Sequence, residues 1–369
     1  MRLPPFRLER YFARYEFNAR YLLCCSDCES MTIRDVLSLE PEAAERFQNS
    51  FLGYTDSQGS PALRQAISSL YTDIRPDQIL VHSGAEEAIF LFMHAVLKSG
   101  DHVIVHFPAY QSLIEVARSI GCEVTPWVAE EQNNWALDVE ALQRQIRHDT
   151  RAIVINMPHN PTGYLMKKDA FHRVVQLADE RKIFLFSDEV YRESEYTASD
   201  RLPAACEASA HGVSLGVMSK TYGLAGLRIG WIATRDQSVS ERMAALKDYT
   251  TICNSAPSEL LAEVALRHRF EIIERNLGII KSNLTVLDRF FAGHKETFTW
   301  KPPLAGPIAF PGLNGDVEEF CRRLVAEAGV LLLPGTVFTR SSNRFRIGFG
   351  RRNMPEAVER LDRFLKEAG

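Results

Sequence analysis

The sequence lacks an apolar run long enough to cross a membrane. Its 369 residues are 46% hydrophobic, yet no stretch reaches the ~18 to 20 uninterrupted apolar residues of a membrane span. The first ten residues, Met1 to Arg10, have no apolar run of the signal-peptide type. We therefore expect a cytoplasmic protein whose hydrophobic residues form a sizeable core.

An excess of positive charge is also missing. Lysine and arginine number 43 against 47 aspartates and glutamates, which gives a net charge of −4. Binding to nucleic acid or to an anionic membrane surface usually requires a basic excess. We therefore expect neither as a partner. The sequence has no internal repeat and no low-complexity tract either.

The seven cysteines lack the arrangement of a metal site. Cys25 and Cys28 have the C-x-x-C spacing, but a metal site of this kind needs a second pair of ligands at similar spacing, and the sequence has none. An odd number of cysteines also argues against a disulfide framework. We expect reduced, structural thiols and no bound metal.

The middle of the chain alternates short β-branched or aromatic runs with longer helical patterns. Strands are predicted at 78–82, 102–107, 151–156, 183–187 and 213–218, and helices at 85–98, 111–120 and 170–181. Such alternation indicates a largely parallel sheet covered on both faces. A long amphipathic helical region at 259–292 precedes a mixture of strands and a helix. This tail predicts a smaller α/β unit, and we expect residues 1–45 to pack with it.

One lysine, Lys220, follows the buried strand predicted at 213–218. Burial disfavours the charged form of a lysine, and an amine that loses its proton becomes a nucleophile able to form a Schiff base. Arg228 follows after a short segment that contains two glycines and can hold an anion. An amine nucleophile beside an anion site suits an aldehyde cofactor that carries a phosphate.

Polar or aromatic residues also follow the other predicted strands. Ligands bind at the carboxyl ends of the strands in open α/β sheets, so these residues are expected to meet in one crevice. They are Gly84, Ala85 and Glu86, then Tyr110, Asn160, Asp188 and Tyr191. Each has a plainer interpretation by itself. The segment Gly84 to Glu86 and the segment around Asn160 could be ordinary turns. Tyr110 could lie in the core, Asp188 at a helix N-cap and Lys220 on the surface.

Together the motifs resemble those of the fold type I pyridoxal-phosphate enzymes, in the class I/II aminotransferase family. They run in the family's order from about residue 53 to 350: Gly53-Tyr54, Gln58-Gly59, Leu63-Arg64, Ser83 to Ala88, Pro108-Ala109-Tyr110, Asn160-Pro161-Thr162-Gly163, Ser187 to Tyr191, Ser219-Lys220 through Trp231, and Phe345 to Phe349. The resemblance implies an α/β fold with a mostly parallel seven-stranded sheet between helices in a large domain. It also implies a smaller α/β domain built from the N- and C-terminal segments. The domain boundaries we predict are 1–45, 46–275 and 276–369.

The resemblance implies roles around pyridoxal 5'-phosphate. Lys220 would hold the cofactor as an aldimine and later move the substrate α-proton. Asp188 would pair with the pyridinium nitrogen, which keeps the ring able to accept electrons. Asn160 and Tyr191 would hydrogen-bond the phenolic oxygen, and Tyr110 would stack on the ring.

The resemblance also implies how the phosphate and the substrate are held. The phosphate site would consist of Gly84, Ala85, Glu86 and Arg228. Tyr54 would reach the phosphate of the neighbouring subunit's cofactor, which implies a homodimer with shared sites. Arg346 would form a bidentate pair with the substrate α-carboxylate, with Asn160 beside it.

Two departures from the family pattern bear on the site. The family often has a phosphate-binding serine three residues before the lysine, where this chain has Val217. The missing contact could come from Ser219. Residues 26–31 stand where many relatives carry a glycine-proline substrate loop. Asp27 and Glu29 in this segment could face a cationic substrate side chain, or could belong to a solvated loop.

The function that follows is transfer of an amino group between an amino acid and a 2-oxo acid. An alternative keeps the cofactor and replaces the reaction by elimination, β/γ-replacement or cyclisation of the capreomycidine synthase type, on a cationic amino acid. A sensor that regulates transcription is a third possibility. The chain offers no room for a DNA-binding domain before Tyr54 and no basic stripe.

Overall fold

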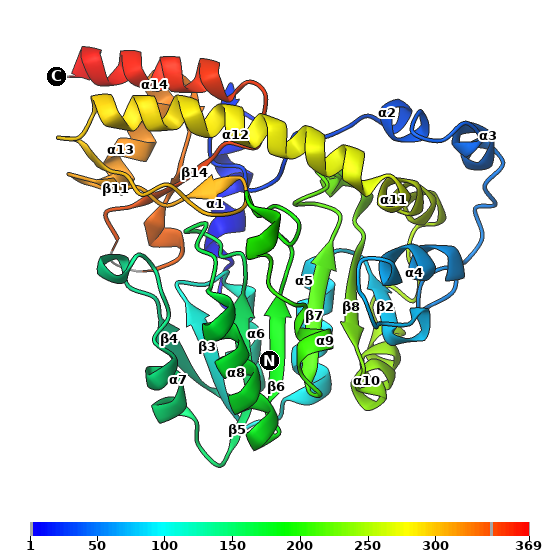
Figure 1. The fold of residues 1–369 in the computed structure, drawn as a ribbon. Coiled ribbons are helices and arrows are strands. Elements are labelled where there is room, and N and C mark those ends of the chain that lie inside the picture. The colour runs from blue at the N-terminus through cyan, green and yellow to red at the C-terminus, as the bar shows by residue number, and fades with distance from the viewer. Residues whose placement is uncertain (1–2, 340–341, 369) are drawn as a thin grey trace.

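A seven-stranded sheet lies at the centre of the larger part of the molecule (Figure 1). The computed structural model describes residues 3–339 and 342–368, and in these ranges the strand order is β2-β8-β7-β6-β5-β3-β4. Only β8 runs antiparallel to its neighbours, which are β2 and β7. The prediction of a mostly parallel seven-stranded sheet is therefore confirmed. The strands are β2 (Ile79–His82), β3 (His102–Phe107), β4 (Glu123–Val128), β5 (Thr150–Asn156), β6 (Phe184–Asp188), β7 (Gly212–Val217) and β8 (Gly230–Thr234).

Helices cover both faces of this sheet because successive side chains of a strand point to opposite faces. Val103 and Val105 of β3 belong to one buried cluster with Phe92. Ile104 between them belongs to another cluster, with Phe171. The helices of the first cluster are α5 (Ala85–Val96), α6 (Ser112–Ile120) and α10 (Gln237–Lys247), and those of the second are α7 (Val139–Gln145) and α8 (Lys168–Arg181).

A third group of helices packs at the β2 and β8 edge of the sheet. Trp231 of β8 and Ile79 of β2 share a buried cluster with Leu63 and Leu261. This region contains α2 (Ile33–Leu37), α3 (Ala43–Gln48), α4 (Pro61–Ser68) and α11 (Ala256–Arg267), while α9 (Ala205–Ala208) contacts β7. None of the helices described in the structure is both long and apolar enough to cross a membrane.

Two strands of the sheet are absent from the sequence prediction. β4 is an edge strand, and most of its residues are exposed or half-buried. It contains Pro126, which edge strands tolerate because one row of their backbone groups has no partner. β8 lies inside the motif that runs from Ser219 to Trp231, where glycines and turns obscure the strand pattern.

The smaller unit joins the two ends of the chain. β1 (Tyr21–Leu22) pairs in parallel with β12 (Val330–Leu331), so a segment near the N-terminus forms a two-stranded sheet with the C-terminal region. Its other elements are β9 (Phe298–Thr299), β10 (Ile308–Ala309), β11 (Gly312–Leu313), β13 (Leu333–Pro334), β14 (Phe345–Gly348), α13 (Val317–Arg323) and α14 (Met354–Ala368). The long helix α12 (Arg269–Gly293) runs across the boundary predicted at 275/276. The exact domain boundaries stay predictions.

Helix α1 (Arg7–Tyr15) contacts both units, beside the carboxyl ends of the sheet strands (Figure 1). The backbone amide of Arg7 donates to Gln111 Oε1 at 2.9 Å, which ties α1 to the loop after β3. The Tyr11 hydroxyl donates to the carbonyl oxygen of Leu332 at 2.9 Å, which ties α1 to the smaller unit. The N-terminal helix is thereby held at the entrance to the crevice.

Candidate active site

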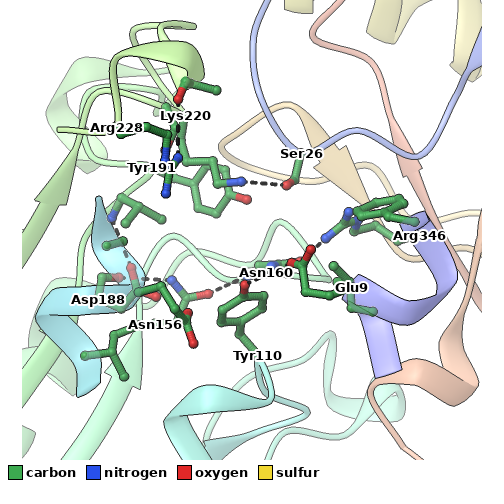
Figure 2. Close-up of a pocket in the computed structure, with 18 residues that line it drawn as sticks. Glu9, Ser26, Tyr110, Asn156, Asn160, Asp188, Tyr191, Lys220, Arg228 and Arg346 are labelled. Carbon is green, nitrogen blue, oxygen red and sulfur yellow. Dashed lines mark hydrogen bonds between the residues drawn. The ribbon is translucent and has the colours of Figure 1, made fainter. Parts of the chain in front are cut away.

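The loops at the carboxyl ends of the strands surround a cavity of about 390 Å³ (Figure 2). This is the edge where ligands bind in open α/β sheets, and the volume suits a small ligand. Most of the residues predicted for the site line this cavity: Ala85, Glu86, Tyr110, Asn160, Asp188, Tyr191, Lys220, Arg228 and Arg346. Strands distant in sequence therefore bring these residues to one place, as predicted from the sequence.

Lys220 follows β7 and extends its amine into the cavity (Figure 2). The Nζ donates a hydrogen bond to Ser26 Oγ at 2.9 Å. Burial lowers the pKa of the Lys220 amine, although Asp27 and other anionic groups oppose the shift. A lowered pKa increases the fraction of free amine, which is the nucleophilic form. The plainer interpretation of Lys220 as a surface lysine is wrong.

Asp188 ends β6 and is buried in the cavity wall. Burial raises the pKa of its carboxyl group to about 7, and the hydrogen bond from the Val190 amide to Oδ1, at 3.3 Å, opposes the shift. The bond from Val190 closes a turn, and no helix begins at this point. Asp188 is therefore not a helix N-cap. A carboxylate in this position needs a charged or protonated partner.

Asn156 links two of the predicted residues. Its Nδ2 donates to the carbonyl oxygen of Asp188 at 3.0 Å, and its Oδ1 accepts from the backbone amide of Asn160 at 2.7 Å. Asn156 also lines the cavity. The sequence prediction assigned it no role, although the signal was present, since Asn156 is the last residue of a predicted strand.

His159 is a second residue that positions this turn. Its Nε2 lies 2.8 Å from the carbonyl oxygen of Pro108, and its Nδ1 lies 2.7 Å from Thr162 Oγ1. Because the carbonyl can only accept, Nε2 carries the proton and Nδ1 accepts from the threonine. Burial lowers the pKa of His159 to about 3, which keeps the ring neutral. His159 thereby ties the loop of Tyr110 to the turn of Asn160.

Two tyrosines contribute to the cavity wall. Tyr191 is buried, and its hydroxyl has no hydrogen-bond partner among the described residues. Buried polar groups are rarely left unpaired, so this hydroxyl is available to a ligand. Tyr110 is half-buried, and its hydroxyl lies 3.5 Å from Glu9 Oε1. Burial raises the pKa of both tyrosines, so both hydroxyls keep their protons at neutral pH.

The start of α5 and Arg228 bring together N–H donors of the kind that can hold an anion. The first amides of a helix have no partner within the helix and point outward. Gly84 precedes them with a φ of +89°, and a Cβ at this position would lie 2.5 Å from Arg228 Nη2. Only glycine combines this backbone conformation with this close approach. Arg228 Nη1 donates to the carbonyl oxygen of Ala225 at 3.3 Å, which orients the guanidinium.

Arg346 lies in β14 and is buried, with 1% of its surface exposed. Its Nε and Nη2 donate to the carbonyl oxygen of Cys24 at 3.2 and 2.9 Å, and its Nη1 donates to Asn160 Oδ1 at 3.1 Å. A guanidinium has five N–H donors in a rigid arrangement. Two of them, one on each Nη, remain for a ligand.

The structure places two other sequence candidates, Tyr54 and Val217, outside the cavity wall. Tyr54 is 91% exposed. Val217 is buried and pairs with Gly230 in the sheet, whereas Ser219 two residues later lines the cavity. A phosphate contact from residue 217 is thus missing, and Ser219 is placed where it can replace it.

The charged side chains of the segment 26–31 have partners within the protein. Asp27 accepts two hydrogen bonds from Arg351 Nη2, at 3.0 and 3.2 Å. Glu29 Oε2 accepts from the backbone amide of Arg352 at 2.9 Å. Neither lines the cavity. The hypothesis that they face a cationic substrate is wrong, because both carboxylates are already bound to the smaller unit.

The sequence prediction missed the residues that the N-terminal region brings to the cavity. Leu8, Glu9 and Phe12 of α1 line it, together with Ser26. Nothing in the local sequence marks them, because no strand precedes α1 among the described residues and its distance from the motifs is set by tertiary packing alone. Glu9 carries a carboxylate that no family motif predicted.

Comparison with known proteins gives the family. Residues 21–361 match the model of the family described as Aminotransferase class I and II. The solved structure of a PLP-dependent aminotransferase from Streptococcus suis 89-1591 superposes with a TM-score of 0.93 at 34% identity, covering 100% of this chain and 99% of that one.

Two relatives that carry different activities are also similar to this chain. Capreomycidine synthase of Streptomyces vinaceus is 30% identical over 94% of this chain and 90% of its own length. An aspartate aminotransferase of Bacillus sp. (strain YM-2) is 26% identical over 88% of this chain and 86% of its own length. The similarity therefore extends over nearly the whole chain in both cases.

The chain belongs to the class I and II aminotransferases. It is a fold type I enzyme that depends on pyridoxal 5'-phosphate and moves an amino group between an amino acid and a 2-oxo acid. The cavity fits this cofactor in its chemistry. It has a partly buried amine, a buried carboxyl group, an unpaired tyrosine hydroxyl and an anion site at a helix start.

Proposed function

We propose that Lys220 binds the aldehyde of the cofactor and, once released from it, carries the substrate α-proton. The observation that carries this role is the position of Nζ in the cavity, with its pKa lowered by burial. When bound, the cofactor ring accepts the electrons left on the α-carbon after its proton is removed. A free amine beside that carbon is a suitable general base.

Asp188, Asn160, Tyr191 and Tyr110 would hold the ring. Asp188 would ionise against a protonated ring nitrogen, which offsets the burial that raises the pKa of its carboxyl group to about 7. The unpaired Tyr191 hydroxyl and the Asn160 amide would donate to the ring's phenolic oxygen. Tyr110 would stack on the ring face.

The phosphate would bind between α5 and Arg228. The amides of Ala85 and Glu86 begin the helix, and the arginine approaches Gly84 closely. Helix N-termini bind phosphate through free amides and the helix dipole. Ser219 would supply the hydroxyl that Val217 lacks, since it lines the same cavity.

Arg346 would bind the α-carboxylate of both substrates. Its side chain is held by Cys24 and Asn160, and its two free N–H groups can pair with two carboxylate oxygens. Asn160 would therefore contact both the cofactor and the group that orients the substrate. Through the hydrogen bond between Asn160 and Arg346, the turn that contains Asn160 would serve both the cofactor site and the substrate site.

The enzyme would act as a homodimer in the cytoplasm, where its seven free cysteines stay reduced. Thr55 Oγ1 donates to the carbonyl oxygen of Asn254 at 3.1 Å, which brings together the segments around 51–57 and 247–254. These segments expose large apolar side chains: Phe51 at 88%, Leu52 at 80%, Tyr54 at 91%, Tyr249 at 90% and Ile252 at 51%. Contiguous exposed apolar residues indicate an interface. A second copy would bury them and place Tyr54 at its partner's phosphate.

Sedimentation equilibrium tests the dimer. The double variant Phe51→Ser with Tyr249→Ser should sediment as a monomer and lose activity. Phe17→Ser removes an aromatic side chain that is 89% exposed near the end of α1, and it should remain dimeric. A monomeric wild-type enzyme with full activity would exclude shared sites.

The roles in the cavity are tested with purified enzyme and pyridoxal 5'-phosphate. The wild type should acquire a visible absorbance band that Lys220→Ala lacks. An amino acid should convert the bound cofactor to its amine form, and a 2-oxo acid should restore it. A band that survives Lys220→Ala would overturn the assignment of Lys220.

The 30% identity to capreomycidine synthase favours a second candidate, a lyase or cyclising reaction on a cationic amino acid. The two candidates differ in the fate of the amino group. Transamination leaves it on the cofactor, whereas elimination releases ammonia and a 2-oxo acid, and cyclisation retains it in the product. Mass spectrometry of the products after a single turnover distinguishes them.

A further inference from the structure

We propose that Glu9 selects substrates whose side chain carries a positive charge. This inference rests on the proposed function, because it uses the cofactor and carboxylate sites named above. Within the described residues, the cations that line the cavity are Lys220, Arg228 and Arg346. Each is assigned to one group, namely the cofactor aldehyde, the phosphate and the substrate α-carboxylate. None of the cations lining the cavity remains for an acidic substrate side chain.

The carboxyl groups of Asp188, Glu86 and Glu9 line the cavity, and they differ in the partners they have. Asp188 is assigned to the ring nitrogen. Glu86 accepts a hydrogen bond from the Ser112 hydroxyl at 3.1 Å, and burial raises its pKa to about 7, so part of it is neutral at pH 7. Glu9 is different: within residues 3–339 and 342–368, no lysine, arginine or histidine nitrogen lies within 4.0 Å of its carboxylate. Its one hydrogen bond there is from the Tyr110 hydroxyl, at 3.5 Å.

Glu9 is held in place because α1 is fixed from both sides. The Arg7 amide is bound to Gln111, and Arg7 Nη1 donates to the carbonyl oxygen of Thr336 at 3.0 Å. The Tyr11 hydroxyl is bound to Leu332. A carboxylate between these anchors belongs to the wall of the cavity and not to a loose terminus.

The position of Glu9 suits the distal end of a substrate. Figure 2 shows its carboxylate beside the Tyr110 hydroxyl, on the same side of the cavity as Arg346. A substrate with its α-carboxylate at Arg346 and its α-carbon near Lys220 would extend its side chain along this wall. Leu8 and Phe12, on the same helix, would contact an aliphatic stem.

The charge of Glu9 then discriminates between substrates. A guanidinium or ammonium group would form a charge-assisted hydrogen bond with the carboxylate. An aspartate side chain would meet a like charge, and within residues 3–339 and 342–368 the arginines of the cavity wall are already assigned to other groups. The site therefore favours basic over acidic amino acids.

The test compares substrates of matched shape on the holoenzyme. L-Arginine and L-citrulline differ in the charge of the terminal group, as do L-lysine and L-norleucine, and L-aspartate represents the acidic side chains. Dissociation constants come from the change in cofactor absorbance on binding, and kcat/KM comes from single turnovers. We expect the wild type to prefer the charged member of at least one pair by about tenfold or more, the scale of a charge-assisted hydrogen bond.

Three variants isolate the carboxylate. Glu9→Gln should reduce the preference for the charged member to about one-tenth or less of its wild-type value, with little change for L-citrulline and L-norleucine. Glu9→Lys should shift the preference towards L-aspartate. Glu16→Gln removes a carboxylate just after α1 and outside the cavity wall, and it should leave the preference unchanged.

The outcomes separate this proposal from the proposed reaction. A wild type that prefers L-aspartate or the neutral member of both pairs overturns the role of Glu9 while leaving transamination intact. An equal loss for charged and neutral substrates in Glu9→Gln also overturns it. Preferential binding of L-arginine or L-lysine that Glu9→Gln abolishes supports the role of Glu9, even if no amine form of the cofactor accumulates. That last result would overturn transamination alone.

Discussion

Lys220 donates from its Nζ to Ser26 Oγ at 2.9 Å, a contact between residues 194 positions apart. The backbone amide of Cys28 also donates to the carbonyl oxygen of Lys220, at 3.3 Å. The segment 26–28 therefore contacts both the amine and the backbone of the lysine. A segment for which the sequence suggested only a substrate contact or a solvated loop sets the surroundings of the reactive amine.

Ser26→Ala should lower the pKa of Lys220 further in the cofactor-free enzyme, because the protonated amine loses an acceptor. More free amine would then be present at neutral pH, and pyridoxal 5'-phosphate should bind several-fold faster. The rate is followed by visible absorbance as a function of pH, and its midpoint should move to lower pH. Ser30→Ala alters an exposed serine of the same segment and should match the wild type. A midpoint that stays or rises would contradict the role of Ser26.

Gly84→Ala should weaken cofactor binding by at least about tenfold, since the new methyl group displaces one charge-assisted phosphate contact. The added Cβ would lie 2.5 Å from Arg228 Nη2. Gly100→Ala is the matched control, because Gly100 has φ +88° and no atom within 4 Å of the added Cβ. Both variants carry backbone strain of about 1–3 kcal/mol. Only Gly84→Ala should lose affinity in a titration with pyridoxal 5'-phosphate.

Arg346→Lys should raise KM for both the amino acid and the 2-oxo acid by about 10- to 100-fold, because an ammonium cannot pair with a carboxylate through two parallel bonds. The absorbance band of the bound cofactor should persist. Arg344→Lys changes a neighbouring arginine outside the cavity wall and should leave both KM values near those of the wild type. A lost band with unchanged KM would place Arg346 at the cofactor instead.

Asp188 should make the cofactor-free enzyme less stable as pH rises from about 4 to 7. Its folded pKa is raised to about 7 from 3.8, so the folded state keeps a proton that the unfolded chain releases. The stabilisation is full below the unfolded pKa and is lost as pH rises through the folded pKa. The free energy of unfolding is measured with urea at pH 5 and 7.5. The Asp188→Asn variant should lack the loss of stability that Asp188 causes between these pH values, which is at most a few kcal/mol.

Bound cofactor should reduce the same pH dependence. A protonated ring nitrogen beside Asp188 stabilises the carboxylate and lowers its pKa again. The difference between pH 5 and 7.5 should therefore be smaller in the holoenzyme than in the cofactor-free wild type. An equal difference in both forms would argue against contact between Asp188 and the ring.

Local sequence was sufficient to predict most of the sheet and much of the site. Buried parallel strands appear as short apolar runs, and the residue after such a run lies at the edge where the loops meet. Asp188 and Lys220 follow this rule, and the structure places both in the cavity. β4 was missed because an edge strand with Pro126 and exposed residues does not form an apolar run.

Charged residues show the limit of such prediction. Asp27 and Glu29 are conspicuous in the sequence, but the Arg351 guanidinium and the backbone amide of Arg352, each more than 300 residues away, bind them. Glu9 is inconspicuous, yet it lines the cavity. A carboxylate affects a ligand only over a short distance, and no local pattern states which cation lies within that distance.

The sequence by itself determined the family, the cofactor and the lysine that would bind it, because these depend on residue types at the ends of strands. The tertiary structure alone decided which carboxylates are paired and which face the cavity. It also decided that α1 and Ser26 complete the wall around Lys220. These contacts join distant segments, so they exist only once the smaller unit has packed against the sheet.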